Sequence, residues 1–136
     1  MNLTTPRASD DIAVLRTRQL EATKRRVIAE LRTRGIGRTT LNYCSEPFAS
    51  GDVENKGIDA ETDNGSPMVL EQQIENAFYD IATLVERFSL DLVAHFHSGF
   101  EIDGGNGYVL IDVQKGAVRI EHTDIEMNQV GSENTF

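Results

Sequence analysis

Apolar and polar positions along the chain predict two helices separated by extended segments. The first predicted helix covers residues 11–34, where apolar side chains recur every three or four residues. This apolar stripe consists of Ala13, Leu20, Val27, Ile28 and Leu31. Asp10 is suited to the N-cap because its carboxylate can accept free backbone N–H groups, and Gly35 is suited to the C-terminal stop.

The second predicted helix has the clearest pattern in the chain. Ser66 and Pro67 suit its N-cap and first helical position, and it is expected to run to His95 or His97, before Gly99. Acidic residues occupy the other faces of this predicted helix. Its apolar face comprises Leu70, Ile74, Ala77, Phe78, Ile81, Leu84, Val85, Phe88 and Leu92.

Four strands are predicted. Residues 36–44 form the first, and a weaker one at 52–62 has so few apolar residues that it lies at an edge or has one solvated face. Residues 108–113 and 117–126 form a hairpin. A two-residue turn at Lys115 and Gly116 would give four facing pairs: Val113 with Val118, Ile111 with Ile120, Val109 with His122, and Asp112 with Arg119.

The expected order is therefore α-β-β-α-β-β. We expect a two-layer α+β sandwich in which two helices cover one face of four mostly antiparallel strands. A flexible N-terminal segment (1–9) precedes a single α+β domain (10–127), and a polar C-terminal tail (128–136) follows it.

Composition limits the class of protein. The chain has 136 residues, 39% of them hydrophobic, which suffices for one core without disulfides or structural metals. Cys44 is the only cysteine, so no internal disulfide can form and a cytoplasmic location is expected. No apolar stretch reaches the length of a membrane span.

Charge is distributed unevenly. The formal net charge is −9, from 13 basic and 22 acidic residues. Residues 1–38 carry nine basic and four acidic groups, and residues 39–136 carry four basic and 18 acidic groups. Such asymmetry bears on partners and association. The two blocks either neutralise each other within the fold or a homodimer, or leave an acidic face free for a partner.

No strong catalytic motif is present. In a helix the side chains of His95 and His97 point about 200° apart, so favourable charges at a helix end are expected there rather than metal ligands. Glu101, Asp103, Asp112 and Glu121 offer oxygen ligands or acid–base groups, but the glycine-rich segment 103–107 has the composition of a solvated loop. No base is placed near Ser50 or Cys44, and no cofactor is predicted.

Short motifs resemble a family of small acidic bacterial proteins catalogued as a domain of unknown function, often found on plasmids or mobile elements. They are Tyr43 followed by residues 50–54, Gly99-Phe100-Glu101, and Ile120-Glu121-His122 with Thr135-Phe136. The resemblance spans residues 36–136. It departs at Ala49 and at Phe100, where that family tends to carry an acid and Trp respectively. It implies a bacterial cytoplasmic protein with no established reaction and, if one surface is functional, singles out Ser50, Gly51, Glu54, Glu101 and His122.

Three functions are compared. The leading expectation is a non-enzymatic acidic interaction protein that binds a basic protein partner, including the case of a DNA-mimic inhibitor from a mobile element. Its interaction candidates are Ser50, Gly51, Glu54, Glu101, Asp103 and His122. A metal-assisted hydrolase or nucleotide-handling enzyme would use Glu54, Glu101 and His122, with Asp103 as a further candidate, and would require them to converge. Direct nucleic-acid binding through the basic first helix is less favoured, because the acidic remainder would repel the polyanion.

Overall fold

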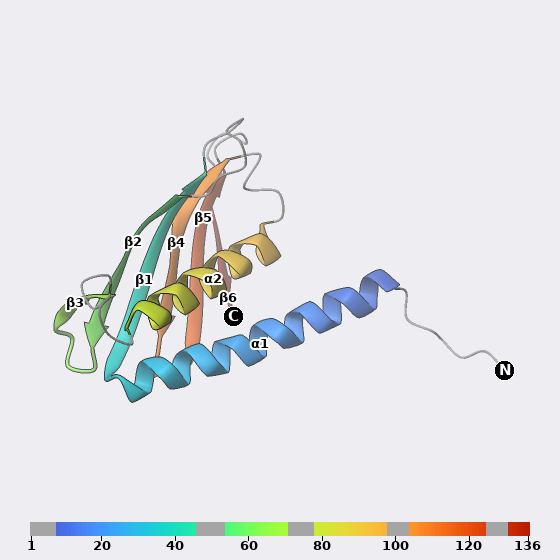
Figure 1. The fold of residues 1–136 in the computed structure, drawn as a ribbon. Coiled ribbons are helices and arrows are strands. Elements are labelled where there is room, and N and C mark those ends of the chain that lie inside the picture. The colour runs from blue at the N-terminus through green and yellow to red at the C-terminus, as the bar shows by residue number, and fades with distance from the viewer. Residues whose placement is uncertain (1–7, 46–53, 71–77, 98–103, 125–130) are drawn as a thin grey trace.

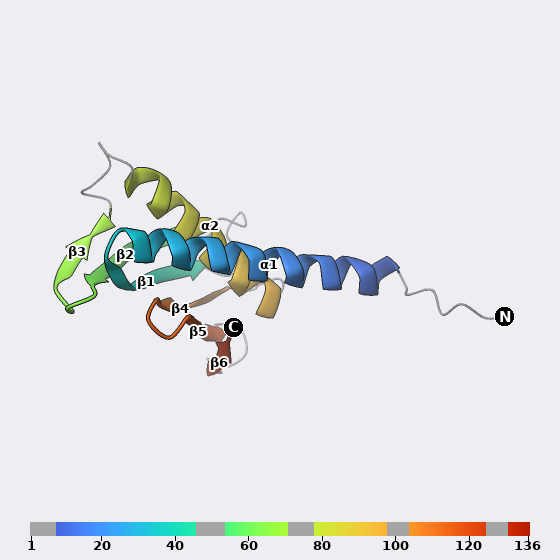
Figure 2. The ribbon, with the colours of Figure 1, turned by 90° about the horizontal axis from the view of Figure 1, so that it is seen from below.

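A computed structural model of the chain shows a two-layer α+β fold. It describes residues 8–45, 54–70, 78–97, 104–124 and 131–136. Within these ranges, both helices lie on one face of a single sheet, and no described helix lies over the other face (Figures 1 and 2). The predicted α+β class is confirmed.

Helix α1 (Ala8–Thr33) begins two residues before the predicted cap, so Asp10 lies within the helix and the prediction that it is the N-cap is wrong. The expected C-terminal stop is confirmed, since Gly35 adopts φ +72°, which favours glycine. Leu20, Val27 and Leu31 are buried, as the apolar spacing predicts. Helix α1 packs against α2 and the sheet through this face.

The N-terminal part of α1 extends past the sheet and α2 (Figures 1 and 2). Ile12 and Leu15 are each 56% exposed and Val14 is 50% exposed. Since burial of the apolar face provides most helical stability, the outer turns of α1 are held mainly by their continuity with the packed part.

In the part of the chain that the structure describes, the sheet contains six strands rather than four. They are β1 (Ile36–Ser45), β2 (Glu54–Thr62), β3 (Pro67–Val69), β4 (Gly105–Asp112), β5 (Ala117–Asp124) and β6 (Gly131–Thr135). Their spatial order is β3-β2-β1-β4-β5-β6, and every neighbouring pair is antiparallel. Strand β2 lies between β1 and β3, so it is not an edge strand. The second possibility for this strand, one solvated face, agrees with the structure, because Asp59 of β2 is exposed on the uncovered face.

Two predicted segments are wrong, and each contains an added strand. Pro67 is not the start of a helix. It opens β3, which pairs with Asp59–Glu61 after a turn closed by the hydrogen bond from Thr62 N–H to the Ser66 carbonyl (2.9 Å). Helix α2 is described over Phe78–Phe96. The predicted polar tail contains β6, which pairs with β5. Strand β3 is only three residues long and β6 has no apolar residue, so pairing supplied by a neighbour decides their structure.

The predicted hairpin register of β4 and β5 is displaced by two residues. Asp112 pairs with Ala117 and Val109 with Ile120, around a four-residue turn at 113–116. The Asp112 carboxylate accepts the backbone N–H of Lys115 at 3.1 Å, which stabilises this longer turn. Side chains alternate with a period of two, so a two-residue displacement keeps the same residues on the core face. Arg119 therefore lies opposite Leu110 rather than Asp112.

The same order of elements, one helix followed by three strands, occurs twice among the described residues. The first strands of the two units, β1 and β4, pair at the centre of the sheet. The core lies between this sheet and the two helices, and includes Leu41, Val109 and Ile120 from the strands with Val85 and Leu92 from α2.

Candidate functional site on the uncovered face of the sheet

The face of the sheet away from the helices is polar and predominantly acidic. Alternation along the strands directs Val109 and Ile120 into the core and their neighbours Tyr108, Arg119 and Glu121 outward. Among the described residues, the charged side chains of this face are Arg38, Asp59, Glu61, Asp112, Arg119, Glu121 and Glu133. Five carboxylates thus share the face with two guanidinium groups.

A hollow of about 470 Å³ lies on β4, β5 and β6. Tyr108, Glu121 and Glu133 contribute adjacent side chains to its lining, because Glu121 is paired with Tyr108 on one side and Glu133 on the other. Gly107 and Gly131 also line it and leave room, having no side chains. An aromatic ring and two carboxylates thus surround one recess.

Arg119 links the two carboxylates of the hollow. Its Nη2 lies 2.6 Å from Glu121 Oε1 and 3.1 Å from Glu133 Oε2. The Coulombic field of Glu133, with a smaller contribution from Glu121, raises the pKa of the Arg119 guanidinium. A hydrogen bond to Glu121 raises the pKa of the Tyr108 phenol. Two carboxylates sharing one guanidinium keep a net negative charge, so the hollow favours a further cation, with which the Tyr108 ring can make a cation–π contact.

On the helix side of the same strands, Tyr43 and His122 form a buried polar pair. The Tyr43 hydroxyl hydrogen-bonds to Nδ1 of His122, and the exposed fractions of the two residues are 2% and 1%. Tyr43 and His122 are both register partners of Gly107, one from β1 and the other from β5. The side chains therefore meet over a residue that has none.

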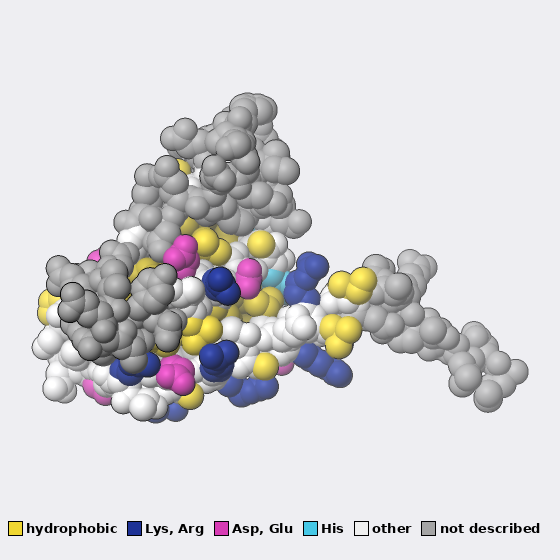
Figure 3. All heavy atoms as spheres, viewed as in Figure 1, with side chains coloured by type: hydrophobic (Ala, Val, Ile, Leu, Met, Phe, Trp, Pro, Cys, Tyr) yellow, Lys and Arg dark blue, Asp and Glu magenta, His cyan; other side chains and the backbone are white. Residues whose placement is uncertain are grey.

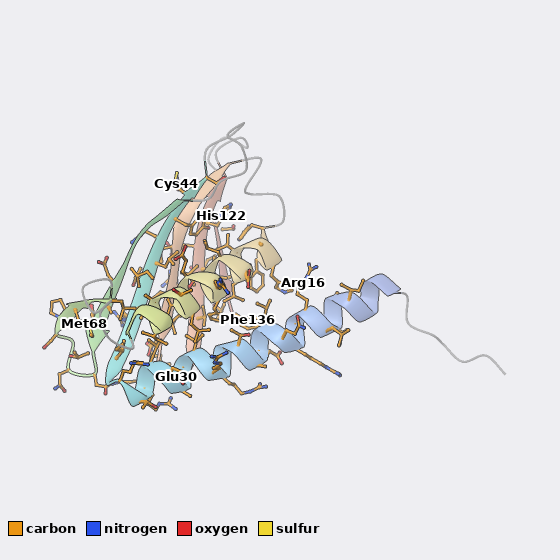
Figure 4. The ribbon with its side chains drawn as sticks, viewed as in Figure 1. Arg16, Glu30, Cys44, Met68, His122 and Phe136 are labelled. Atoms are coloured by element: carbon orange, nitrogen blue, oxygen red, sulfur yellow. The ribbon has the colours of Figure 1, made fainter. Side chains whose placement is uncertain are left out.

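His97, just after α2 and half-buried, extends the network that begins at this buried pair. Its ring stacks on His122 with centroids 4.2 Å apart, and its Nε2 is 2.7 Å from Oδ1 of Asn134 in β6. Figure 4 shows His122 near the end of the sheet that the C-terminal end of α2 approaches. The network links α2, β1, β5 and β6 directly behind the hollow, and so positions the strand that carries Glu133.

The structure describes only two of the six predicted interaction candidates, Glu54 and His122, and they lie on different strands. Ser50, Gly51, Glu101 and Asp103 lie outside the described residues. Glu54 begins β2 as a register partner of Cys44 in β1. His122 is on β5, separated from β2 by β1 and β4, or about 14 Å at the usual strand spacing. Within the described ranges, no three His, Cys, Asp or Glu side chains form a group that could hold a metal ion.

Residues 105–107 of the glycine-rich segment do not form the solvated loop that its composition indicates, because they belong to β4. A Cβ on Gly105 would lie 2.4 Å from Cε1 of His122, and one on Gly107 would lie 1.8 Å from the Glu121 carbonyl oxygen. These glycines make space for the His122 ring and for close strand pairing. In the sequence, the signal was a glycine cluster directly preceding an alternating strand.

The outer hollow and the network on the helix side of β4, β5 and β6 include residues that were not among the predicted interaction candidates. Tyr108, Arg119 and Glu133 belong to the outer hollow, while Tyr43, His97 and Asn134 belong to this network. The sequence signal for the outer face was the spacing of polar residues, an even number of positions apart, in 108–112 and 119–121. In each of these stretches, an acidic residue occupies one of the polar positions.

Comparisons of this chain with protein-family models, with curated proteins and with solved structures give no match. The resemblance to small acidic bacterial proteins stays a prediction. In the described part of the chain, neither helix has the length and apolar character required to cross a membrane.

Proposed function

We propose that this protein is a non-enzymatic interaction protein that binds a basic protein partner through the uncovered face of its sheet. The observation that carries the proposal is the hollow in which Tyr108, Glu121 and Glu133 lie together. A lysine or arginine side chain of the partner would enter it, next to carboxylates that Arg119 only partly neutralises.

The remainder of the face supports the same chemistry. Arg38 has Glu61 and Asp112 as its register partners in the two neighbouring strands, so one basic residue has an acidic residue on each side of it across the sheet. Asp59 adds an exposed acid on β2. A basic surface would therefore meet negative charge across the sheet, which increases the association rate and makes binding depend on salt.

If the partner's basic site normally binds nucleic acid, the protein would act as a DNA-mimic inhibitor that competes for this site. In that case, adding the protein would release DNA from the captured partner. The alternative enzyme would need Glu54 and His122 to converge, and the separation of β2 from β5 gives it no support.

The test is a pull-down from a bacterial lysate at low salt and at about 0.5 M salt, where charges are screened beyond about 4 Å. We expect wild type to retain a basic protein at low salt and lose it at high salt. The variant Glu121→Gln/Glu133→Gln should lose it at low salt. The matched control, Glu21→Gln/Glu30→Gln, removes the same charge from α1 and should retain it.

Recovery of no basic protein at low salt would contradict the proposal. Equal recovery with both double variants would also contradict it, because binding would then not use the hollow.

A further inference from the structure

A second groove lies on the other layer of the molecule and has the opposite charge. It has a volume of about 600 Å³ and runs between α1, the turn joining β4 and β5, and Phe136. Lys24, Arg25 and Arg32 line it, together with one acid, Glu21. Figure 4 shows Phe136 beside α1, and Figure 3 shows Lys and Arg side chains gathered along this helix.

The groove belongs to a cationic stretch of chain. Segment 12–34 carries seven basic and two acidic side chains, whereas the rest of the described side chains comprise four basic and eight acidic groups. The asymmetry read from the sequence is thus kept in the fold as two differently charged layers.

Two of the groove cations are positioned by backbone oxygens. Lys24 Nζ donates to the Phe136 backbone oxygen at 2.8 Å and lies 5.5 Å from the centre of the Phe136 ring. Arg32 donates through Nη2 to the Val113 carbonyl at 3.0 Å. These contacts order long side chains before any ligand arrives, which lowers the entropy cost of binding.

The cations retain capacity for an anion. Among the described residues, no Asp or Glu carboxylate lies within 4.0 Å of Lys24, Arg25 or Arg32, although the same helix has an Arg34–Glu30 contact at 3.8 Å. Arg25 and Arg32 are both exposed and seven residues apart, so their Cα atoms are about 10.5 Å apart along the helix. An extended segment with separated carboxylates would match this spacing.

The groove also has apolar lining. Ile28 is buried beneath it, and Phe136 packs against the core from its other side. Such lining suits a ligand with an apolar side chain as well as negative charge. A nucleic-acid backbone offers only the charge to these positions and no apolar side chain to contact Ile28 and Phe136.

We propose that this groove binds an acidic peptide segment of a protein partner, with its carboxylates at Arg25, Arg32 and Lys24 and an apolar side chain against Ile28 and Phe136. This site is separate from the hollow on the sheet and takes the opposite charge. The protein would therefore present one acidic and one basic docking surface, on its two layers.

The test begins with a phage-displayed library of random twelve-residue peptides, from which binders of the wild-type protein are selected. Peptides that also bind the double variant Arg25→Gln/Arg32→Gln are then removed. We expect the retained peptides to have an excess of Asp and Glu and to share an apolar position. In fluorescence anisotropy, each groove substitution should weaken the best peptide by about fivefold at low salt, the upper range of an exposed ion pair. The control Arg38→Gln, which changes an exposed guanidinium on the uncovered face of the sheet and outside the groove, should change affinity less than twofold, as expected for a distant surface charge.

The readout on the protein is the set of backbone amide NMR shifts of Ile28, Gly116 and Phe136, which should move on peptide addition. The proposal is overturned if retained peptides show no acidic excess, or if no peptide survives removal on the variant. It is likewise overturned if a single-stranded oligonucleotide shifts the same amides at lower concentration than the peptide. Both variants replace exposed side chains, so circular dichroism should show wild-type folding.

Discussion

Tyr43 and His122 meet across Gly107, the strand residue paired with both of them. The hydrogen bond joins β1 to β5, which are not neighbours in the sheet. It lies directly behind the hollow on the outer face, whose lining includes Gly107 and His122 themselves. The buried pair and the proposed docking surface therefore depend on the same short piece of β-sheet.

Substitution Gly107→Ala should destabilise the fold strongly. The new Cβ would lie 1.8 Å from the Glu121 carbonyl oxygen, so β4 and β5 would have to separate locally. We expect a loss of about 3 kcal/mol or more in the free energy of unfolding, measured by urea denaturation. Gly131→Ala is the matched control, since its Cβ would have only ordinary contacts at 3.8 and 3.9 Å. Equal stability of both variants would refute the close approach at Gly107.

Substitution Tyr43→Phe should remove the buried hydrogen bond to His122 while keeping the ring. Loss of a partner for a buried polar atom costs about 1 to 3 kcal/mol, and urea denaturation should show a decrease in that range. The partly exposed Tyr108→Phe should change stability by about 0.5 kcal/mol or less. If Tyr43→Phe leaves the free energy of unfolding unchanged, the hydrogen bond between Tyr43 and His122 contributes nothing to stability.

The two ends of α1 should respond differently to the same truncation. Leu31 is fully buried, so Leu31→Ala should cost about 2 to 5 kcal/mol through lost burial and the cavity left behind. Leu15 is 56% exposed on the projecting end, so Leu15→Ala should change stability by about 0.5 kcal/mol or less. Thermal unfolding of the two variants measures the contrast. A large loss for Leu15→Ala in the monomer would mean that this end of α1 packs against the body.

Asp91 of α2 should make stability depend on pH. Partial burial raises the pKa of its carboxyl above 3.8, and the Coulombic field of Arg87 opposes this. The folded state then binds this proton more tightly than the unfolded state, so the contribution of Asp91 to stability falls as pH rises through the raised pKa.

Asp91→Asn should therefore have a higher Tm than wild type at neutral pH, and the difference should vanish well below pH 3.8. Arg87→Gln removes the opposing charge and should lower Tm at neutral pH. A Tm difference between Asp91→Asn and wild type that does not vary with pH would contradict the assignment.

Local patterns predicted much of the framework. The spacing of Leu20, Val27 and Leu31 identified the buried face of α1, and the alternation of Val109, Ile111, Val118 and Ile120 identified the core face of the hairpin. These predictions hold because periods of 3.6 and two residues follow from backbone geometry alone. The hairpin register was wrong by two residues because that displacement leaves the pattern of faces unchanged.

Two segments at the edges of the sheet were misassigned. Pro67–Val69 and Gly131–Thr135 form β3 and β6 at the two edges of the sheet, although their sequences indicated a helix start and a polar tail. Their hydrogen-bond partners lie in β2 and β5, so no local window contains the interaction that orders them. The same holds for the site, where Tyr108, Glu121 and Glu133 come together only through strand pairing.

The sequence by itself determined the α+β class, the buried faces of the main elements and the opposition of a basic N-terminal block to an acidic remainder, because periodicity and charge are properties of the chain. Tertiary structure decided the number and order of strands, the meeting of Tyr43 with His122, and the position of each charged group on a layer. Those features depend on pairing between residues far apart in the chain, such as the 79 positions that separate Tyr43 from His122.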